Sequence, residues 1–141
     1  MPINLLKILP AMAIAILCVA YSAGTAAQPQ DNLKNFTGAT HYTRGMAGFA
    51  GHQFDADIIF ENILATDNAE SIFLEAIRSP NSTSASIAYS FCGLKKLDSK
   101  KLHEIKKLLS SSNAEVSLMN GDVMKKEALS KLILSIYDHG C

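Results

Sequence analysis

The sequence predicts an all-α protein built of antiparallel helix pairs, arranged as a helical array or a small bundle. From about residue 54 onward, apolar residues recur at spacings of three and four positions, which is typical of amphipathic helices. Polar residues that favour helix starts precede several of these stripes. The chain has 141 residues, of which 48% are apolar and 18% charged, so we expect one folded domain rather than intrinsic disorder.

The first 27 residues have the order of a secretory signal peptide. Lys7 precedes an apolar run at 8–19, and small residues follow at 23–27, as in exported proteins. A retained membrane anchor is the alternative, but the run is shorter than the roughly 20 residues that span a bilayer. We therefore expect cleavage after Ala27 and a small bacterial protein that is periplasmic or secreted, with no membrane span after signal cleavage.

The next region, residues 28–53, is expected to be an irregular N-terminal arm in front of a helical domain at 54–141. It contains four glycines and shows neither a helical nor a strand period. The apolar residues Met46, Phe49 and Phe54 are the points where this arm could pack on the domain.

Two helices are expected at the start of the domain. Six of the eight residues at 58–65 are apolar, which predicts a well-buried helix. Asp67 and Glu70 have the spacing of a capping box, and a second apolar stripe follows at 72–77. Pro80 then ends this helix.

The second half of the domain is expected to contain three more helices. The third begins near residues 82–84 and includes Gly93, which predicts the close approach of a neighbouring backbone. A fourth helix follows Asp98. Residues 115–124 form either a short hairpin around Asn120-Gly121, a favoured turn dipeptide, or a plain loop. The last helix is expected from about 125 to 137.

Residues 83–116 resemble one HEAT-type helical repeat. A helix rich in small residues (86–97), a turn at Asp98 and a second helix that closes with Leu108 and Leu109 follow one another as in that repeat. The resemblance implies stacked helix pairs and, by analogy, the binding of a protein partner.

The cysteines predict one disulfide. Signal cleavage leaves Cys92 and Cys141, and in an oxidising compartment two cysteines allow a single intramolecular bridge. The alternative is an inert core thiol at Cys92, with Cys141 free or paired between chains.

No motif indicates catalysis. The histidines lack metal-ligand spacing, no serine lies in a Gly-x-Ser-x-Gly elbow, and the glycines at 45–51 lack the features of a phosphate loop. We expect no catalytic residue, metal or cofactor. The alternative is a small periplasmic hydrolase or metal-dependent enzyme that uses His52 with Asp55 or Asp57.

Charge is balanced in total but unevenly placed. Thirteen basic and thirteen acidic residues argue against nucleic-acid binding, which needs a basic face. Residues 55–75 hold six acids and no base, whereas 95–107 hold six lysines and two acids. The lysines are Lys95, Lys96, Lys100, Lys101, Lys106 and Lys107.

These lysines are either a solvated surface or a basic face that steers an acidic partner. If they form such a basic face, the protein is a non-enzymatic protein–protein interaction module, with an inhibitor or immunity-type protein as one form.

Overall fold

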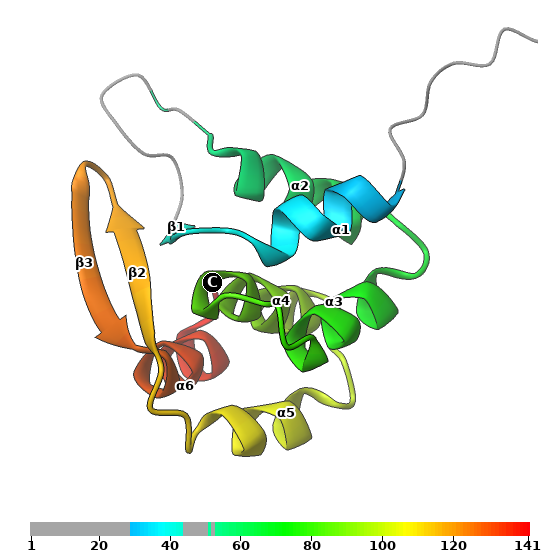
Figure 1. Cartoon of the computed structure of the whole chain (residues 1–141). Coiled ribbons are helices and arrows are strands. Elements are labelled where there is room, and N and C mark those ends of the chain that lie inside the picture. Colours follow the sequence, from blue (N-terminus) through cyan, green and yellow to red (C-terminus); the bar gives the residue numbers. More distant parts are fainter. Residues whose placement is uncertain (1–28, 44–50, 52) are drawn as a thin grey trace, which may run out of the picture.

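A three-stranded sheet joins six helices in the computed structural model, which describes residues 29–43, 51 and 53–141 (Figure 1). Within these residues the helices are α1 (Pro29–Thr37), α2 (Asp55–Leu64), α3 (Ala69–Arg78), α4 (Ser84–Lys96), α5 (Leu102–Leu109) and α6 (Leu129–His139). The strands are β1 (Tyr42–Thr43), β2 (Glu115–Asn120) and β3 (Val123–Ala128). The expected all-α class is therefore wrong, and the protein is mixed α/β with a high helical content.

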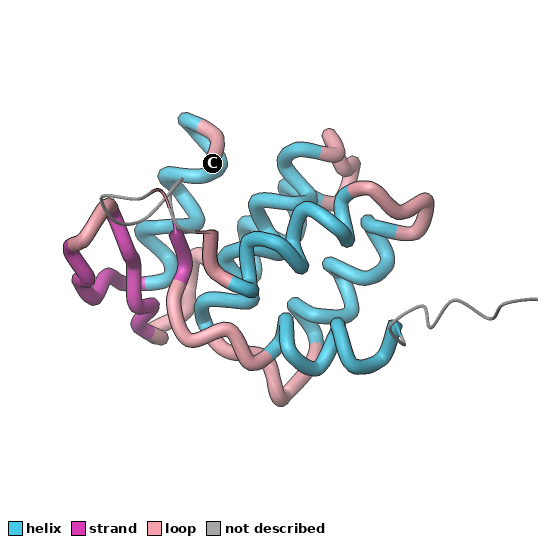
Figure 2. The backbone as a smooth tube through the Cα atoms, turned by 90° about the horizontal axis from the view of Figure 1, so that it is seen from above, coloured by secondary structure: helices cyan, strands magenta, loops and turns pink. Residues whose placement is uncertain are grey.

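The sheet has the order β1-β2-β3 and lies at one end of the helices (Figure 2). β1 pairs with β2 in parallel, with Tyr42 opposite Leu118, and β2 pairs with β3 in antiparallel fashion. The hairpin is present, but Asn120 pairs with Val123, so its turn residues are Gly121 and Asp122, one position later than expected. Gly121 has a φ of 59°, which suits the first position of a two-residue II′ turn.

The last helix begins later than the sequence predicts, because β3 extends to Ala128. The sequence Lys125-Lys126-Glu127 is made of good helix formers, and β3 buries none of its six residues. The strand therefore carries no apolar alternation that could reveal it. Its conformation is set by pairing with β2, whose Val116 and Leu118 are buried.

Helix α4 is the centre of the fold (Figure 1), and α3, α6 and β2 pack against it. Nine of its residues between Ala85 and Leu94 are buried, as expected for a helix with neighbours on several sides. Thr83 caps its start and accepts a hydrogen bond from the backbone N–H of Ser86 at 3.1 Å.

Gly93 marks a close approach between α3 and α4, but the neighbour is a side chain rather than the expected backbone. A Cβ atom on Gly93 would lie 2.3 Å from Cε2 of Phe73. The Phe73 ring is fully buried and contacts the rings of Phe36 and Phe60. The missing side chain therefore leaves the space that this ring fills.

The segment expected to be irregular contains α1 and β1. Phe36, Ala39 and Tyr42 pack it into the core. The signal segment, Met46 and Phe49 lie outside the described residues. Phe54 precedes α2, and its ring contacts the ring of His41.

The helices α4 and α5 lie where the HEAT-type resemblance places them, and that resemblance stays a prediction. In the described ranges, no helix combines the length and the apolar character needed to cross a membrane.

Candidate functional site

A disulfide joins Cys92 in α4 to Cys141 after α6, which confirms the predicted pairing. Cys92 is buried and Cys141 is exposed. Gly140 adopts a φ of 87° at the end of α6, a conformation that glycine takes without strain, and the chain then returns to α4. The bridge closes a loop with a sequence separation of 49 residues, a covalent link suited to an oxidising compartment.

A pocket of about 340 Å³ lies beside this disulfide, where α2, α4 and β1 meet. Three aromatic residues, three charged residues and both cysteines contribute to its lining. These residues are Tyr42, Phe60, Tyr89, Asp57, Glu61, Lys96, Cys92 and Cys141. The pocket therefore combines rigid apolar walls with a few charged groups, which is the usual composition of a small-ligand site.

A hydrogen-bonded cluster of Thr43, Asp57 and Tyr89 forms part of this pocket. Thr43 Oγ1 and the Tyr89 hydroxyl both lie within hydrogen-bond distance of Asp57 Oδ1, the latter at 2.6 Å. The Tyr89 hydroxyl also accepts from the backbone N–H of Thr43 at 3.2 Å. Asp57 Oδ2 accepts from the backbone N–H of Phe54, also at 3.2 Å. The carboxylate is thus held in one orientation by α4, by β1 and by the start of its own helix.

Burial raises the pKa of Tyr89 well above its ordinary value of 10, and the hydrogen bond to Asp57 raises this pKa further. The hydroxyl therefore stays protonated throughout the physiological range and remains a hydrogen-bond donor.

Lys96 and Glu61 form an ion pair beside the pocket. The Lys96 Nζ lies 3.2 Å from Glu61 Oε1 and 5.2 Å from the centroid of the Phe60 ring. Both side chains are about half exposed, so the pair contributes little to stability.

The six lysines predicted as a basic face fall into three groups. Lys95 and Lys106 both approach Tyr137 of α6. Lys95 Nζ donates to the Tyr137 carbonyl oxygen at 2.9 Å, and Lys106 Nζ lies 3.9 Å from the ring centroid. These two lysines tie α4 and α5 to α6, while Lys96 belongs to the pocket.

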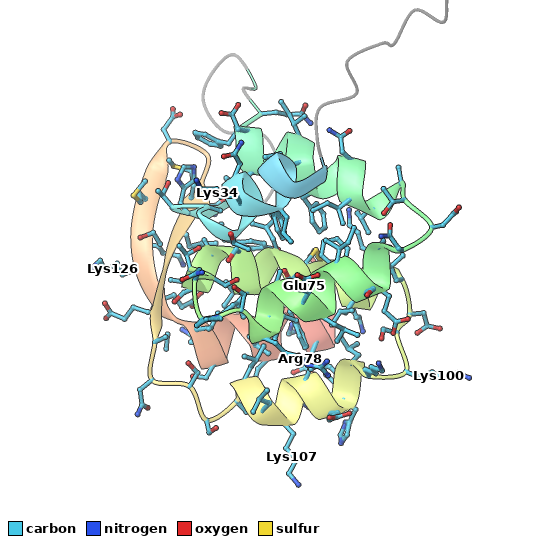
Figure 3. All side chains as sticks on the ribbon, turned by 45° about the vertical axis from the view of Figure 1, so that its right-hand side comes forward. Lys34, Glu75, Arg78, Lys100, Lys107 and Lys126 are labelled. Atoms are coloured by element: carbon cyan, nitrogen blue, oxygen red, sulfur yellow. A yellow bond between two sulfur atoms is a disulfide. The ribbon has the colours of Figure 1, made fainter. Side chains whose placement is uncertain are left out.

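The remaining three, Lys100, Lys101 and Lys107, are exposed around α5. Figure 3 shows Lys100 and Lys107 extending away from the body. Leu108 lies beside Lys107 with 62% of its surface exposed, whereas Leu102, Ile105 and Leu109 cover the core side of the same helix.

Arg78 at the end of α3 shares a surface hollow with Lys101. We call Arg78, Lys100, Lys101, Lys107 and Leu108 together the α5 end. The acidic helix α2 lies on the other side of α4 (Figure 1). The acids of α2 and the cations of the α5 end therefore lie on opposite sides of α4.

Of the residues of the alternative enzyme hypothesis, the structure describes Asp55 and Asp57, which line separate pockets. His52 lies outside the described residues. Asp55 lines a separate hollow next to α1, and Asp57 is engaged by Thr43 and Tyr89. In the described part of the chain, no three His, Cys, Asp or Glu side chains are grouped so that they could hold a metal ion.

Sequence reasoning did not find Thr43 and Tyr89. Thr43 lies in the segment expected to be irregular, and Tyr89 is 46 positions away. The one local signal is a tyrosine flanked by small and apolar residues within a buried helix, since a buried tyrosine hydroxyl usually needs a hydrogen-bond partner.

Comparisons with protein-family models, with curated proteins and with solved structures find no match to this chain.

Proposed function

We propose that the protein is an exported, non-enzymatic interaction module that binds an acidic protein partner through the α5 end. An inhibitor or immunity-type protein is one form of this function. The observation that carries the proposal is the exposure of Leu108 beside Lys107 near the end of α5, a helix that Lys100 and Lys101 precede.

The α5 end has the arrangement of a small interface. When a partner covers an exposed apolar side chain, the loss of its contact with water makes binding more favourable. Charged residues on the same surface steer the encounter. Lys100, Lys101 and Lys107 supply that charge. Glu104 in α5 and Glu75, which shares the hollow of Arg78 and Lys101, offset part of this charge, and the four cations leave the surface with a net positive charge.

The contrast between the acidic helix α2 and the net basic α5 end supports the same partner chemistry. A protein with acidic residues at one end and basic residues at the other aligns in the field of a charged partner before contact. An acidic partner would attract the α5 end and repel α2. This asymmetry favours one docking orientation.

Export is supported by two independent features. The order of Lys7, the apolar run at 8–19 and the small residues 23–27 fits a cleaved signal. The disulfide between Cys92 and Cys141 fits an oxidising compartment.

Site-specific cross-linking in the native host tests the proposal. A photoreactive amino acid at position 108 is expected to capture an acidic protein from the periplasmic or secreted fraction. The double variant Lys100→Glu, Lys101→Glu should reduce the captured amount. The control Lys34→Glu, Lys125→Glu makes the same change in net charge away from the α5 end and should leave capture unchanged.

Equal loss in both double variants would contradict the proposed surface. Capture of a basic protein would contradict the proposed partner chemistry.

A further inference from the structure

The pocket beside the disulfide has a negative lining, although the α5 end is positive. Asp57 and Glu61 face one compensating cation, Lys96. Two negative charges and one positive charge leave a formal charge of −1. An uncompensated carboxylate in a partly enclosed pocket favours a ligand with a positive charge.

Aromatic rings form one wall of the same pocket. Tyr42 and Tyr89 have ring centroids 4.7 Å apart, and Phe60 and Tyr89 have centroids 5.5 Å apart. All three side chains are buried in the core, so the wall is rigid. The faces of such rings attract cations, an interaction that strengthens when the cation loses water.

An ammonium group of the protein already uses both features. Lys96 Nζ lies against the Phe60 ring and pairs with Glu61, so the pocket mouth has a geometry that holds a charged nitrogen. The Lys96 side chain is 45% exposed and can turn to solvent at small cost. It is an internal competitor for an incoming cation.

Asp57 retains room for one further donor. Its Oδ1 atom lies within hydrogen-bond distance of Thr43 and Tyr89, while Oδ2 accepts one bond from the described residues, donated by Phe54. A carboxylate oxygen can accept two hydrogen bonds, so among the residues that the structure describes Oδ2 keeps a lone pair for a further donor. The surrounding donors hold the carboxylate in place before a ligand arrives, which lowers the cost of binding.

We propose that this pocket binds a ligand through one positively charged nitrogen group, an ammonium or a guanidinium. The carboxylates of Asp57 and Glu61 pair with the charge, and the rings of Tyr42, Phe60 and Tyr89 surround the attached carbon chain. The ligand is either a free amine or a basic side chain of a peptide, because both present the same chemistry.

Titrations followed by NMR of the oxidised protein test this proposal at constant ionic strength. The probes are n-butylammonium, ethylguanidinium and a capped peptide with a single arginine, and n-butanol is the neutral control. At least one charged probe should shift the signals of the pocket residues in a saturable way, whereas butanol should not. Binding by the small cations identifies a free amine as ligand, and binding by the peptide alone identifies a basic side chain.

Three variants assign the binding to the pocket. Asp57→Asn should weaken it about tenfold or more, because a charged hydrogen bond is lost. Glu61→Gln should weaken it about threefold, and Lys96→Gln should strengthen it about threefold, as expected for exposed pairs. Glu61 and Lys96 are exposed, so these two variants test the proposal even if Asp57→Asn does not fold.

The double variant Lys100→Glu, Lys101→Glu should bind the charged probes as the wild type does, since it alters the α5 end. The proposal is overturned if no charged probe binds, if butanol binds equally well, or if Glu61→Gln and Lys96→Gln leave the affinity unchanged.

Discussion

Substitution of Gly93 by alanine tests the packing of α3 against α4. On an open helix surface this change is stabilising by about 1 kcal/mol, because alanine has the higher helix propensity. At Gly93 the new Cβ would lie 2.3 Å from Cε2 and 2.6 Å from Cδ2 of Phe73. These separations are far below van der Waals contact, so either the ring or the helix must move.

The Phe73 ring has little freedom to move away. It is fully buried, with the Phe36 ring centroid at 6.1 Å and that of Phe60 at 5.6 Å. Overpacking of this kind costs typically 1–3 kcal/mol. After the gain in propensity is subtracted, we expect Gly93→Ala to lower the free energy of unfolding by up to about 2 kcal/mol.

Urea denaturation followed by circular dichroism measures the effect. Gly38→Ala is the matched control, because its Cβ would meet no atom closer than 3.5 Å. This control should leave the protein unchanged or stabilise it by up to about 1 kcal/mol. An increase in stability for Gly93→Ala, equal to that of the control, would refute the packing described for Phe73.

Three further predictions concern the disulfide and the buried cluster. Cys141→Ala should lower the free energy of unfolding by about 4 kcal/mol, the chain-entropy value for a loop of about 50 residues, and chemical denaturation of this variant should match that of the reduced wild type. Tyr89→Phe should lower the free energy of unfolding by about 1.5–3 kcal/mol, because Asp57 loses a donor and the backbone N–H of Thr43 loses its acceptor. An unchanged denaturation midpoint would contradict the hydrogen bonds described for this cluster. The pKa of Tyr89 is higher in the folded protein than its ordinary value of 10, so its contribution to stability is complete below pH 10 and is lost as the pH rises further. Absorbance at 295 nm should accordingly show a tyrosine that ionises well above pH 10 in the wild type and is missing in Tyr89→Phe, and a missing component centred at pH 10 would oppose this assignment.

The parts of the fold that follow from the sequence are those that local rules determine. The apolar stripes identify α2 to α5 because each helix buries one face. The Cys92–Cys141 bridge follows because two cysteines have one possible intramolecular partner each. Gly93 was identified as a close-approach position, since glycine within a buried helix usually has a packing reason.

The strands could not be predicted in the same way. β1 has two residues, and its pairing with β2 joins positions 76 residues apart, such as Tyr42 and Leu118. No local pattern encodes such a pair. β3 buries none of its residues, so it shows no alternation between apolar and polar side chains.

The two candidate sites differ in how far the sequence could predict them, and the reason is the same. The lysine-rich segment is a local feature and was visible in the sequence. The engagement of Lys95 and Lys106 with Tyr137 depends on the placement of α6, which the spacing of charges does not contain. The cluster of Thr43, Asp57 and Tyr89 draws on three separate elements and exists only in the folded chain.

The association rate with the protein captured at position 108 tests the central claim most directly. Lys100→Glu, Lys101→Glu should slow association at low salt, and the difference from wild type should shrink as ionic strength rises. The dissociation rate should change less, because these exposed side chains lie at the start of α5 and Leu108 lies in its last turn. An association rate that equals that of the wild type at low salt would contradict the α5 end as the binding surface.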